Sequence, residues 1–440
     1  MQQTNNIYTA TIFPGKAAGS VQIPPSKSLA HRAVICAALA NGESRLTGLD
    51  PQHLSNDIQT TIAGMQRLGA NIRFAANNDL IVRGGELTLS HDEPWVIDCG
   101  ESGSTLRFFI PIFSLLGLPV LLIGHGRLPQ RPQTVYSQIF AEQNLTLKQT
   151  PAQDGWLVRG PLRPGEFTLQ GNISSQFISG LLFALPLLAA SSTLHILPPF
   201  ESRSYVELTI DMLSRFGITV RWLDAHTLQI PGNQQYRPAN ISIEGDFSQL
   251  AFFAVLGSIS SAPQGIRISG VNSLSQQGDR KIIEIIRQMN GQITQEGNDY
   301  ICRPARLRAT PIDLADCPDL GPVLTVLAAF AEGETRIYNA GRLRIKESDR
   351  IADVVQELSR CGVKISATAD EMLISGSPQA LYQAAGPCLS HNDHRIVMAL
   401  SVLAAAMGSP LQIQDAQAVN KSYPQFFQDL QGLGLQVIIK

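Results

Sequence analysis

Apolar residues recur at helical spacing in a segment that repeats along the chain. In residues 57–69 (DIQTTIAGMQRLG) the apolar positions follow one helix face, a glycine ends the segment, and a short β-like stretch comes next. Glycine and asparagine favour the left-handed conformation in which many helices end. Further copies predict helices at 133–144, 205–217, 280–291, 350–362 and 424–434. Their terminal residues 69, 144, 217, 291, 362 and 434 recur at a period of roughly 73 residues.

A second series of segments has the same period and is apolar on nearly all sides. Each begins with a small polar cluster and predicts a buried helix, at 29–40, 106–116, 177–190, 250–256, 320–330 and 396–406. Short stretches rich in Val and Ile, such as 80–82 and 372–374, predict the second strands of hairpins. Because two independent series share one period, we interpret the chain as six repeats of a unit with two helices and short strands.

Length and composition refine this architecture. A chain of 440 residues exceeds what one hydrophobic core supports, so we expect two domains of three units, with the apolar helices inside. The formal charge of −2 arises from 34 basic and 36 acidic residues. A nucleic-acid binder normally has a basic excess, so we expect no nucleic-acid partner.

Targeting and cysteine signals point to a soluble protein. The apolar stretches 108–124 and 177–190 contain proline and are shorter than a bilayer span of about 20 residues, so we expect no membrane segment. Residues 1–6 are polar and do not resemble a signal peptide, which favours a cytoplasmic location. The cysteines are far apart and show no zinc or disulfide spacing, so we expect reduced thiols and no metal site.

The polar residues that begin the apolar helices suggest anion binding. Helix N-termini carry free N–H groups and a partial positive charge, so converging N-termini would bind anions. Helix capping explains Asp246 and Ser104. It does not explain Lys27 and Arg395, because cations oppose the helix dipole at that end. Further cations occupy equivalent unit junctions, namely Arg127, Arg131, Arg342, Arg344, Lys346, Arg350 and Lys421. Arginine matches phosphate and carboxylate groups, so we predict a pocket for two anionic substrates.

Five of these motifs together resemble a known family. Residues 24–33 (PPSKSLAHRA) are similar to the S-K-S-x-x-x-R-A signature of the 5-enolpyruvylshikimate-3-phosphate synthase family, and 344–350 (RIKESDR) to its R-x-K-E-[ST]-D-R box. Residues 174–177, 392–395 and 421–424 resemble further family segments in the family's order. The resemblance covers nearly the whole chain. It implies an α+β fold, similar to an inverted α/β barrel, with six βαβαββ repeats in two three-repeat domains around a cleft.

The resemblance also implies domain limits and substrate contacts. One domain would span 26–240 and the other 1–25 with 241–440, so that the chain crosses the hinge twice and the first strand, 7–13, joins the C-terminal domain. The residues implied for shikimate 3-phosphate are Lys27, Ser28, Arg32, Ser174, Ser175, Gln176, Ser202, Tyr205, Asp319 and Lys346. Those implied for phosphoenolpyruvate are Lys27, Gly103, Arg131, Arg350, Arg395 and Lys421.

The implied reaction is the addition of the 5-hydroxyl of shikimate 3-phosphate to C2 of phosphoenolpyruvate, followed by elimination of phosphate. This chemistry needs a base and an acid, and the candidates are Asp319 and Glu347, with Lys27 as a third catalytic residue. On position alone, Asp319 is also a possible helix N-cap, and Glu347 is a possible ion-pair partner of Lys346 or Arg350. We expect no metal and no organic cofactor, and a monomer.

Some positions depart from the family pattern, and two other functions fit parts of the sequence. Glu101, Ser102, Phe108, Arg342 and His31 differ from the residues common in the family, which affects the shape of the phosphoenolpyruvate pocket. A sister enzyme that uses UDP-N-acetylglucosamine shares the fold, but it typically carries a lysine–asparagine pair and a loop cysteine that are absent here. A non-catalytic anion-sensing repeat protein is the second alternative.

Overall fold

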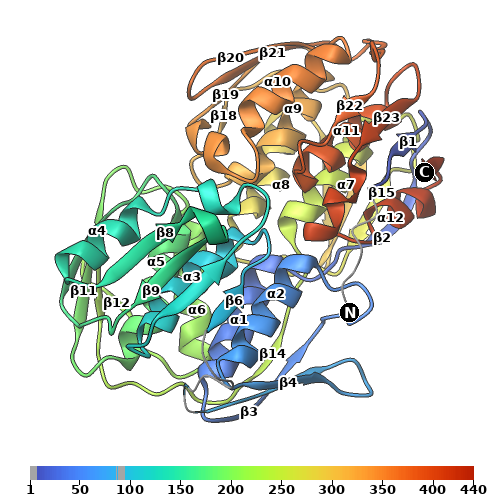
Figure 1. Cartoon of the computed structure of the whole chain (residues 1–440). Coiled ribbons are helices and arrows are strands. Elements are labelled where there is room, and N and C mark those ends of the chain that lie inside the picture. Colours follow the sequence, from blue (N-terminus) through green and yellow to red (C-terminus); the bar gives the residue numbers. More distant parts are fainter. Residues whose placement is uncertain (1–6, 86, 88–94) are drawn as a thin grey trace. The chain divides into compact units, whose positions relative to one another are not determined.

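The computed structural model describes residues 7–85, 87 and 95–440 of the chain (Figure 1). Contacts divide the chain into two compact units, one of Met1–Pro24 with Glu244–Lys440 and one of Pro25–Ile243. The first six residues, on which the expectation about a signal peptide rests, lie outside the described ranges. Within those ranges no helix is long and apolar enough to cross a membrane.

Both predicted helix series are present. The apolar series forms α1 (Lys27–Leu39), α3 (Gly103–Ser114), α5 (Ser175–Ala184), α7 (Phe247–Ile259), α9 (Gly321–Ala329) and α11 (His394–Ala405). The amphipathic series forms α2 (Asn56–Arg67), α4 (Thr134–Glu142), α6 (Arg203–Arg215), α8 (Ile282–Gln288), α10 (Arg350–Arg360) and α12 (Phe426–Gly432). Short 3-10 helices connect them, namely η1 (Leu128–Gln130), η2 (Pro151–Gln153), η3 (Leu185–Leu187), η4 (Gly278–Lys281), η5 (Pro318–Leu320), η6 (Gly341–Ile345) and η7 (Ala416–Lys421).

The amphipathic helices share one type of C-terminal cap. A residue with positive φ follows each helix, and the next N–H donates to the carbonyl five residues back, as in a Schellman motif. The donor–acceptor pairs are Ala70–Met65, Leu145–Phe140, Ile218–Leu213, Gly291–Ile286, Val363–Leu358 and Leu435–Leu430. The predicted terminal residue at 291 was wrong, because Asn290 has φ 63° and Gly291 does not adopt the left-handed conformation. Asparagine tolerates that conformation, so the helix ends one residue earlier.

Within the described residues the strands form six four-stranded sheets of one topology, in which one edge pair is parallel and the other two are antiparallel. In the Pro25–Ile243 unit they are β14 (Asn240–Ser242)–β3 (Gly42–Thr47)–β5 (Leu80–Gly84)–β4 (Asn71–Phe74), β6 (Val96–Asp98)–β7 (Val120–Ile123)–β9 (Gly155–Arg159)–β8 (Thr146–Thr150) and β10 (Glu166–Gln170)–β11 (Ser192–Leu197)–β13 (Thr227–Ile230)–β12 (Arg221–Trp222). In the other unit they are β2 (Gly19–Gln22)–β15 (Ile266–Ser269)–β17 (Asp299–Arg303)–β16 (Gln292–Glu296), β18 (Ile312–Asp313)–β19 (Gly333–Tyr338)–β21 (Met372–Gly376)–β20 (Lys364–Ala367) and β22 (Cys388–Leu389)–β23 (Leu411–Gln414)–β1 (Ala10–Ile12)–β24 (Val437–Ile439).

Three strands pair with partners that are distant in the sequence. The strand β2 precedes α1 but pairs in parallel with β15, whereas β14 precedes α7 but pairs in parallel with β3. The first strand, β1, lies between β23 and β24 and is antiparallel to both. Three of the six sheets are therefore completed by a strand from a distant part of the chain.

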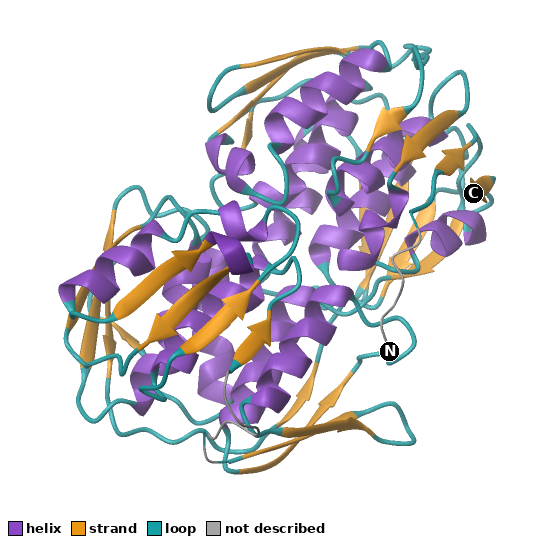
Figure 2. Cartoon of the chain, in the orientation of Figure 1, coloured by secondary structure: helices purple, strands orange, loops and turns teal. Residues whose placement is uncertain are grey.

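The helices of the apolar series form the centre of each unit. Figure 2 shows the helices of each unit gathered together with the strands around them. All but one residue of α7 and every residue of α9 and α11 are buried, and the strands alternate buried and more exposed positions. Each unit has its own hydrophobic core. The fold class is confirmed by the six repeated pairs of helices and the six sheets. Because the apolar helices are buried on all sides, they carry polar residues mainly where they begin.

Candidate functional site

A cluster of charged residues surrounds Asp319 in the Glu244–Lys440 unit. Asp319 lies in η5, directly before α9. Its carboxylate accepts from Arg350 Nη1 at 2.9 Å, Arg395 Nη2 at 3.1 Å and Lys346 Nζ at 3.3 Å. The N-cap of α9 is Leu320, with no side-chain cap, so the capping interpretation of Asp319 was wrong. The carboxylate instead holds three cations together.

Arg350 is the central cation of this cluster and begins α10. Its side chain is 1% exposed, and its Nε donates to Asp393 Oδ2 at 2.7 Å. Its Nη2 donates to Glu347 Oε2, also at 2.7 Å, so the ion-pair interpretation of Glu347 is confirmed. Although burial opposes the charge, the three surrounding carboxylates raise the pKa of Arg350 above its usual value. Arg350 therefore remains a cation and connects both candidate catalytic carboxylates.

The cations also fix the protonation state of Asp319. Burial alone would raise the pKa of this carboxyl group, but Arg395, Lys346 and Arg350 together hold it well below its usual range. Burial lowers the pKa of Lys346, an effect that Asp319 opposes. Asp319 is therefore a carboxylate at neutral pH in the absence of a bound anion.

The N-termini of α7, α9 and α11 meet at this cluster. Asp393 caps α11 by accepting from the Arg395 N–H at 2.9 Å. The Arg395 guanidinium donates to Ser248 Oγ at the start of α7 and to the Asp319 carbonyl before α9, both at 3.1 Å. Lys421 Nζ donates to the Asn392 carbonyl at 2.5 Å. The convergence of helix N-termini predicted from the sequence is present within this unit.

The Pro25–Ile243 unit has a corresponding cluster at the starts of α1, α3 and α5. Lys27 begins α1, and its Nζ donates to Asp57 Oδ2 at 2.7 Å. Arg32 is 3% exposed and donates to the Ser28 carbonyl, Thr209 Oγ1 and the Tyr205 carbonyl. Burial lowers the pKa of Arg32 to about 10, so it is still charged at neutral pH. Arg32 thus ties the start of α1 to α6.

Gln176 connects α3 and α5 through side-chain hydrogen bonds. Arg107 Nη1 donates to Gln176 Oε1 at 2.6 Å, and Gln176 Nε2 donates to Ser104 Oγ at 2.8 Å. Ser174 caps α5 by accepting from the Gln176 N–H, and Ser175 begins that helix. The Arg107 guanidinium also lies 4.8 Å from the centre of the Phe177 ring. The predicted segment 174–176 is therefore held rigidly at the start of α5.

Gly103 and Arg131, both implied for phosphoenolpyruvate, are adjacent. A Cβ atom on Gly103 would lie 2.4 Å from Arg131 Nη1 and 2.8 Å from its Cζ. Arg131 follows η1 and is 7% exposed, and its Nε has no hydrogen-bond partner among the described residues. A buried, unpartnered guanidinium nitrogen is costly unless a ligand binds it. The first turn of α3 and Arg131 therefore form a candidate anion site.

The two remaining residues implied for shikimate 3-phosphate lie at the start of α6. Ser202 is the residue before the helix and has φ 53°, a conformation that is uncommon for residues other than glycine. Tyr205 is half-buried, and its carbonyl accepts from Arg32. These residues are joined to the start of α1 through Arg32.

The departures from the family pattern at His31 and Phe108 contact each other. Their rings pack edge to face with centroids 6.3 Å apart, and the Arg32 guanidinium lies 5.6 Å from the Phe108 ring centre. Burial, with Lys27 and Arg32 nearby, holds the pKa of His31 well below its usual value. A neutral imidazole adds no further positive charge to this cluster. Its Nδ1 lies 2.7 Å from Thr61 Oγ1.

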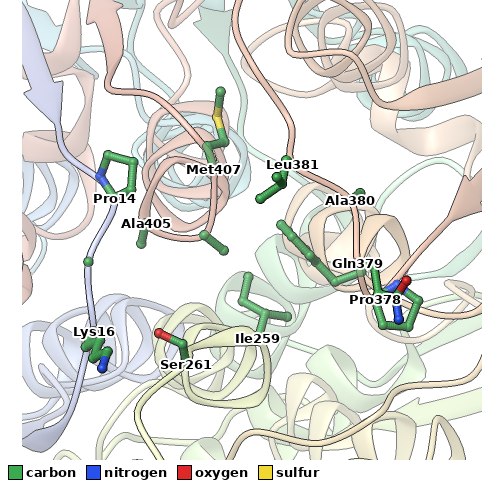
Figure 3. Close-up of a pocket in the computed structure, with 13 residues that line it drawn as sticks. Pro14, Lys16, Ile259, Ser261, Pro378, Gln379, Ala380, Leu381, Ala405 and Met407 are labelled. Atoms are coloured by element: carbon green, nitrogen blue, oxygen red, sulfur yellow. The ribbon is translucent and has the colours of Figure 1, made fainter.

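A cavity of about 430 Å³ lies at the other end of α7, α9 and α11 (Figure 3). It is lined by residues at the C-terminal ends of these helices, including Ile259, Phe330 and Ala405, and by the segment 378–381. Lys16 is the one charged residue in its lining. This cavity lacks the converging cations and carboxylates of the cluster around Asp319.

Three structurally important charged residues were not singled out from the sequence. They are Asp57, Arg107 and Asp393, which bind Lys27, Gln176 and Arg350 respectively. Arg107 carried a signal, because it is a charged residue inside an otherwise apolar helix. Asp393 lies in the 392–395 motif, but its capping and pairing roles depend on tertiary contacts.

The cysteine side chains lie in the hydrophobic interior of the two units. All six cysteines are buried and unpaired by disulfides. Burial raises the pKa of Cys36, Cys99, Cys302 and Cys317 above the usual thiol value. Among the described residues no group of three or more His, Cys, Asp or Glu side chains is arranged to hold a metal ion.

Known proteins resemble this chain in both sequence and fold. Residues 13–430 match the family described as EPSP synthase (3-phosphoshikimate 1-carboxyvinyltransferase). The chain is 42% identical to 3-phosphoshikimate 1-carboxyvinyltransferase of Clostridium perfringens, covering 96% of this chain and 97% of the relative, and 41% identical to that of Clostridium kluyveri, covering 97% of both. Its fold is similar to that of EPSP synthase from Acinetobacter baumannii, with a TM-score of 0.78, 23% identity and coverage of 98% and 100%. At that identity the structural likeness concerns the fold alone.

Proposed function

Because the chain belongs to the EPSP synthase (3-phosphoshikimate 1-carboxyvinyltransferase) family, we propose that its two cation clusters bind phosphoenolpyruvate and shikimate 3-phosphate for enolpyruvyl transfer. The protein is a transferase of the shikimate pathway, which serves aromatic amino acid biosynthesis. The product keeps the 3-phosphate of the acceptor, and the phosphate of phosphoenolpyruvate is released. The observation that carries the assignment of roles is the position of Asp319 and Glu347 on one buried arginine, Arg350.

Phosphoenolpyruvate is assigned to Lys27, Gly103, Arg131, Arg350, Arg395 and Lys421. The unpartnered Nε of Arg131 supports this assignment, because a phosphate or carboxylate oxygen would satisfy it. Glycine at position 103 supports it as well, since only an absent side chain leaves room for the guanidinium. Phosphoenolpyruvate would thus accept hydrogen bonds both from arginine side chains and from the N–H groups at the start of α3.

Shikimate 3-phosphate is assigned to Lys27, Ser28, Arg32, Ser174, Ser175, Gln176, Ser202, Tyr205, Asp319 and Lys346. The capped start of α5 supports the phosphate contacts, because its serine hydroxyls and N–H groups are donors fixed before binding. Arg32 has protein partners on each of its three nitrogens, so its proposed contribution is to hold Ser28 and Tyr205 in place.

In the addition step, Asp319 accepts the proton of the 5-hydroxyl as that oxygen attacks C2. Glu347, which is protonated once the anionic substrate takes over its hydrogen bond with Arg350, delivers its proton to C3. In the elimination step, the C3 proton returns to Glu347, the C–O bond to phosphate breaks, and the proton on Asp319 passes to the departing phosphate, which restores both side chains. A carboxylate with a strongly lowered pKa is a weak base. An anionic substrate would compete for Arg350, Arg395 and Lys346, which would raise the pKa of Asp319 when the base is needed. Lys27 and the arginines stabilise the charge of the departing phosphate.

The test is phosphate release from phosphoenolpyruvate with either shikimate 3-phosphate or UDP-N-acetylglucosamine. We expect release with shikimate 3-phosphate only, and its loss in Asp319→Asn and Glu347→Gln. The matched control is Glu332→Gln, because Glu332 pairs with Arg306 on the surface, and full activity is expected. Release with the sugar nucleotide would transfer the assignment to the sister enzyme. Binding of both ligands without release would indicate an anion sensor.

Three further properties belong to this proposal. The unpaired, buried cysteines support a reducing cytoplasmic location. We propose a monomer, which sedimentation equilibrium would test. We also propose that the compact units correspond to two substrate-binding domains near residues 26–240 and 241–440, with the N-terminal 25 residues in the second; limited proteolysis at their junctions would test this assignment.

A further inference from the structure

A strained loop lies between β22 and α11, next to the cluster around Asp319. His391 has φ 52° and Asn392 has φ 54°, so two consecutive non-glycine residues adopt the left-handed conformation. Asparagine tolerates this conformation, whereas histidine adopts it at a cost of the order of 1 kcal/mol, and such strain persists where surrounding contacts hold it. The residues 390–393 therefore need a specific brace.

The brace is a pair of carboxylates on α10. Glu357 has a fully buried side chain, and its Oε1 lies 2.8 Å from His391 Nε2. Its Oε2 accepts from the Leu389 N–H at 3.2 Å, just before the loop. Asp353 Oδ1 lies 3.3 Å from His391 Nδ1. One helix thus binds both nitrogens of the imidazole and the main chain that leads into the loop.

The loop orients two cations that have been assigned to phosphoenolpyruvate. Asp393 is fully buried and binds Arg350 through both carboxylate oxygens, at 2.7 and 3.2 Å. The Asn392 carbonyl accepts from Lys421 Nζ. A change in the backbone at 391 and 392 would therefore move the acceptors of both cations.

We propose that His391 and Glu357 are positioning residues, which hold the 390–393 loop so that Asp393 and the Asn392 carbonyl place Arg350 and Lys421 for phosphoenolpyruvate. The proposal rests on the proposed assignment of these two cations to that substrate. Neither His391 nor Glu357 is among the residues assigned to a substrate. Both residues affect binding by holding the loop in place, and the effect concerns phosphoenolpyruvate alone.

The geometry requires a protonated imidazole, because a carboxylate faces each ring nitrogen. The hydrogen bond with Glu357 raises the pKa of His391, with Asp353 and Asp393 adding to the effect and burial opposing it. Because the folded-state pKa is raised, the brace is complete at and below the usual histidine pKa of about 6.5. As the pH rises through the raised value, the imidazole loses its charge and one of its two N–H donors, so the brace weakens.

The experiment compares the KM for each substrate in the whole protein and in three variants, from about pH 6 to about pH 9. His391→Asn removes the imidazole but keeps a residue type that tolerates positive φ. Glu357→Gln keeps the size of the side chain and removes its charge. The control is His195→Asn, which makes the same change on β11 of the other unit.

We expect His391→Asn and Glu357→Gln to raise the KM for phosphoenolpyruvate roughly tenfold near pH 6, with the KM for shikimate 3-phosphate unchanged. The ratio of the His391→Asn value to the wild-type value should fall as the pH rises, because the wild-type brace weakens when the imidazole loses its charge. A ratio that does not vary with pH, an equal increase for both substrates, or a lower melting temperature with unchanged kinetics would each overturn the proposal. Phosphate release by the wild-type protein is measured first. If there is none, the proposed function is wrong, and the result does not concern His391 and Glu357.

Discussion

Substitution of Gly103 by alanine would test the anion site at the start of α3. Gly103 is the first residue of the helix and does not have positive φ, so alanine fits its backbone. The added Cβ would lie 2.4 Å from Arg131 Nη1, 2.8 Å from Cζ and 3.0 Å from Nη2. Optimal separation of non-bonded atoms is about 3.5 Å, so the guanidinium must withdraw by about 1 Å.

This displacement should alter binding far more than stability. The clashing atoms are the far end of a flexible side chain, and alanine is a better helix former than glycine by about 1 kcal/mol. A misplacement of about 1 Å at a reacting group can cost up to about 100-fold, so we expect the KM for phosphoenolpyruvate to rise roughly ten- to a hundredfold. The KM for shikimate 3-phosphate should stay within about twofold, because its assigned contacts with Arg32 and the start of α5 are untouched.

The assay is initial-rate phosphate release with each substrate varied in turn. The control is Gly432→Ala in α12, where an added Cβ has no heavy atom within 4 Å and the kinetics should not change. In an Arg131→Ala background, Gly103→Ala should have little further effect, because the clashing group is gone. An unchanged KM for phosphoenolpyruvate, or equal increases for both substrates, would refute the assignment of Arg131.

Three further outcomes concern stability, each measured by urea unfolding. Asp393→Ala should lower the free energy of unfolding by about 3–5 kcal/mol, because it leaves the buried Arg350 without its main partner and α11 without its cap; a loss below about 1 kcal/mol would contradict this. Because the pKa of Asp319 is lowered in the folded protein, its carboxylate adds stability above the unfolded-state pKa of about 3.9. This stability is lost as the pH falls through the folded-state pKa, so Asp319→Asn should lose less stability than the wild type below about pH 4. The same dependence of the urea-unfolding free energy on pH in both proteins would contradict that sign. Tyr136→Phe should cost about 1 kcal/mol, because the buried hydroxyl lies 2.8 and 3.0 Å from two main-chain carbonyl oxygens, and no change would show that these contacts are not stabilising.

The repeat could be predicted because hydrophobic periodicity reports which faces of a helix are buried. The terminal residues of five amphipathic helices were correct, since glycine and asparagine mark the left-handed cap directly. The error at 291 arose where Asn290 and Gly291 are adjacent and both are suitable cap residues. The prediction 250–256 was shorter than α7 because Ser248 and Gln249 are polar but buried inside the helix.

The site could be predicted in part. Lys27 and Arg395 were identifiable because a cation at a helix N-terminus is unfavourable without an anion nearby. Which carboxylates pair with them was not, because such pairing depends on which segments meet in three dimensions; Asp319 was named only through the family resemblance, and for another role. Lys27 binds Asp57, 30 residues away, and Arg395 binds Asp319, 76 residues away. No local pattern distinguishes such carboxylates from solvated ones.

The position of β1 between β23 and β24 imposes an order on folding during synthesis. Ala10 pairs with Ile413 and Ile439, and Thr9 and Lys440 exchange main-chain hydrogen bonds. The strand β1 therefore cannot pair until β23 and β24, about 400 residues later, have been made. The Pro25–Ile243 unit is continuous in sequence and can close its sheets once β14 emerges. We therefore expect this unit to fold first on the ribosome, while β1 stays unpaired and exposed to aggregation until β23 and β24 emerge.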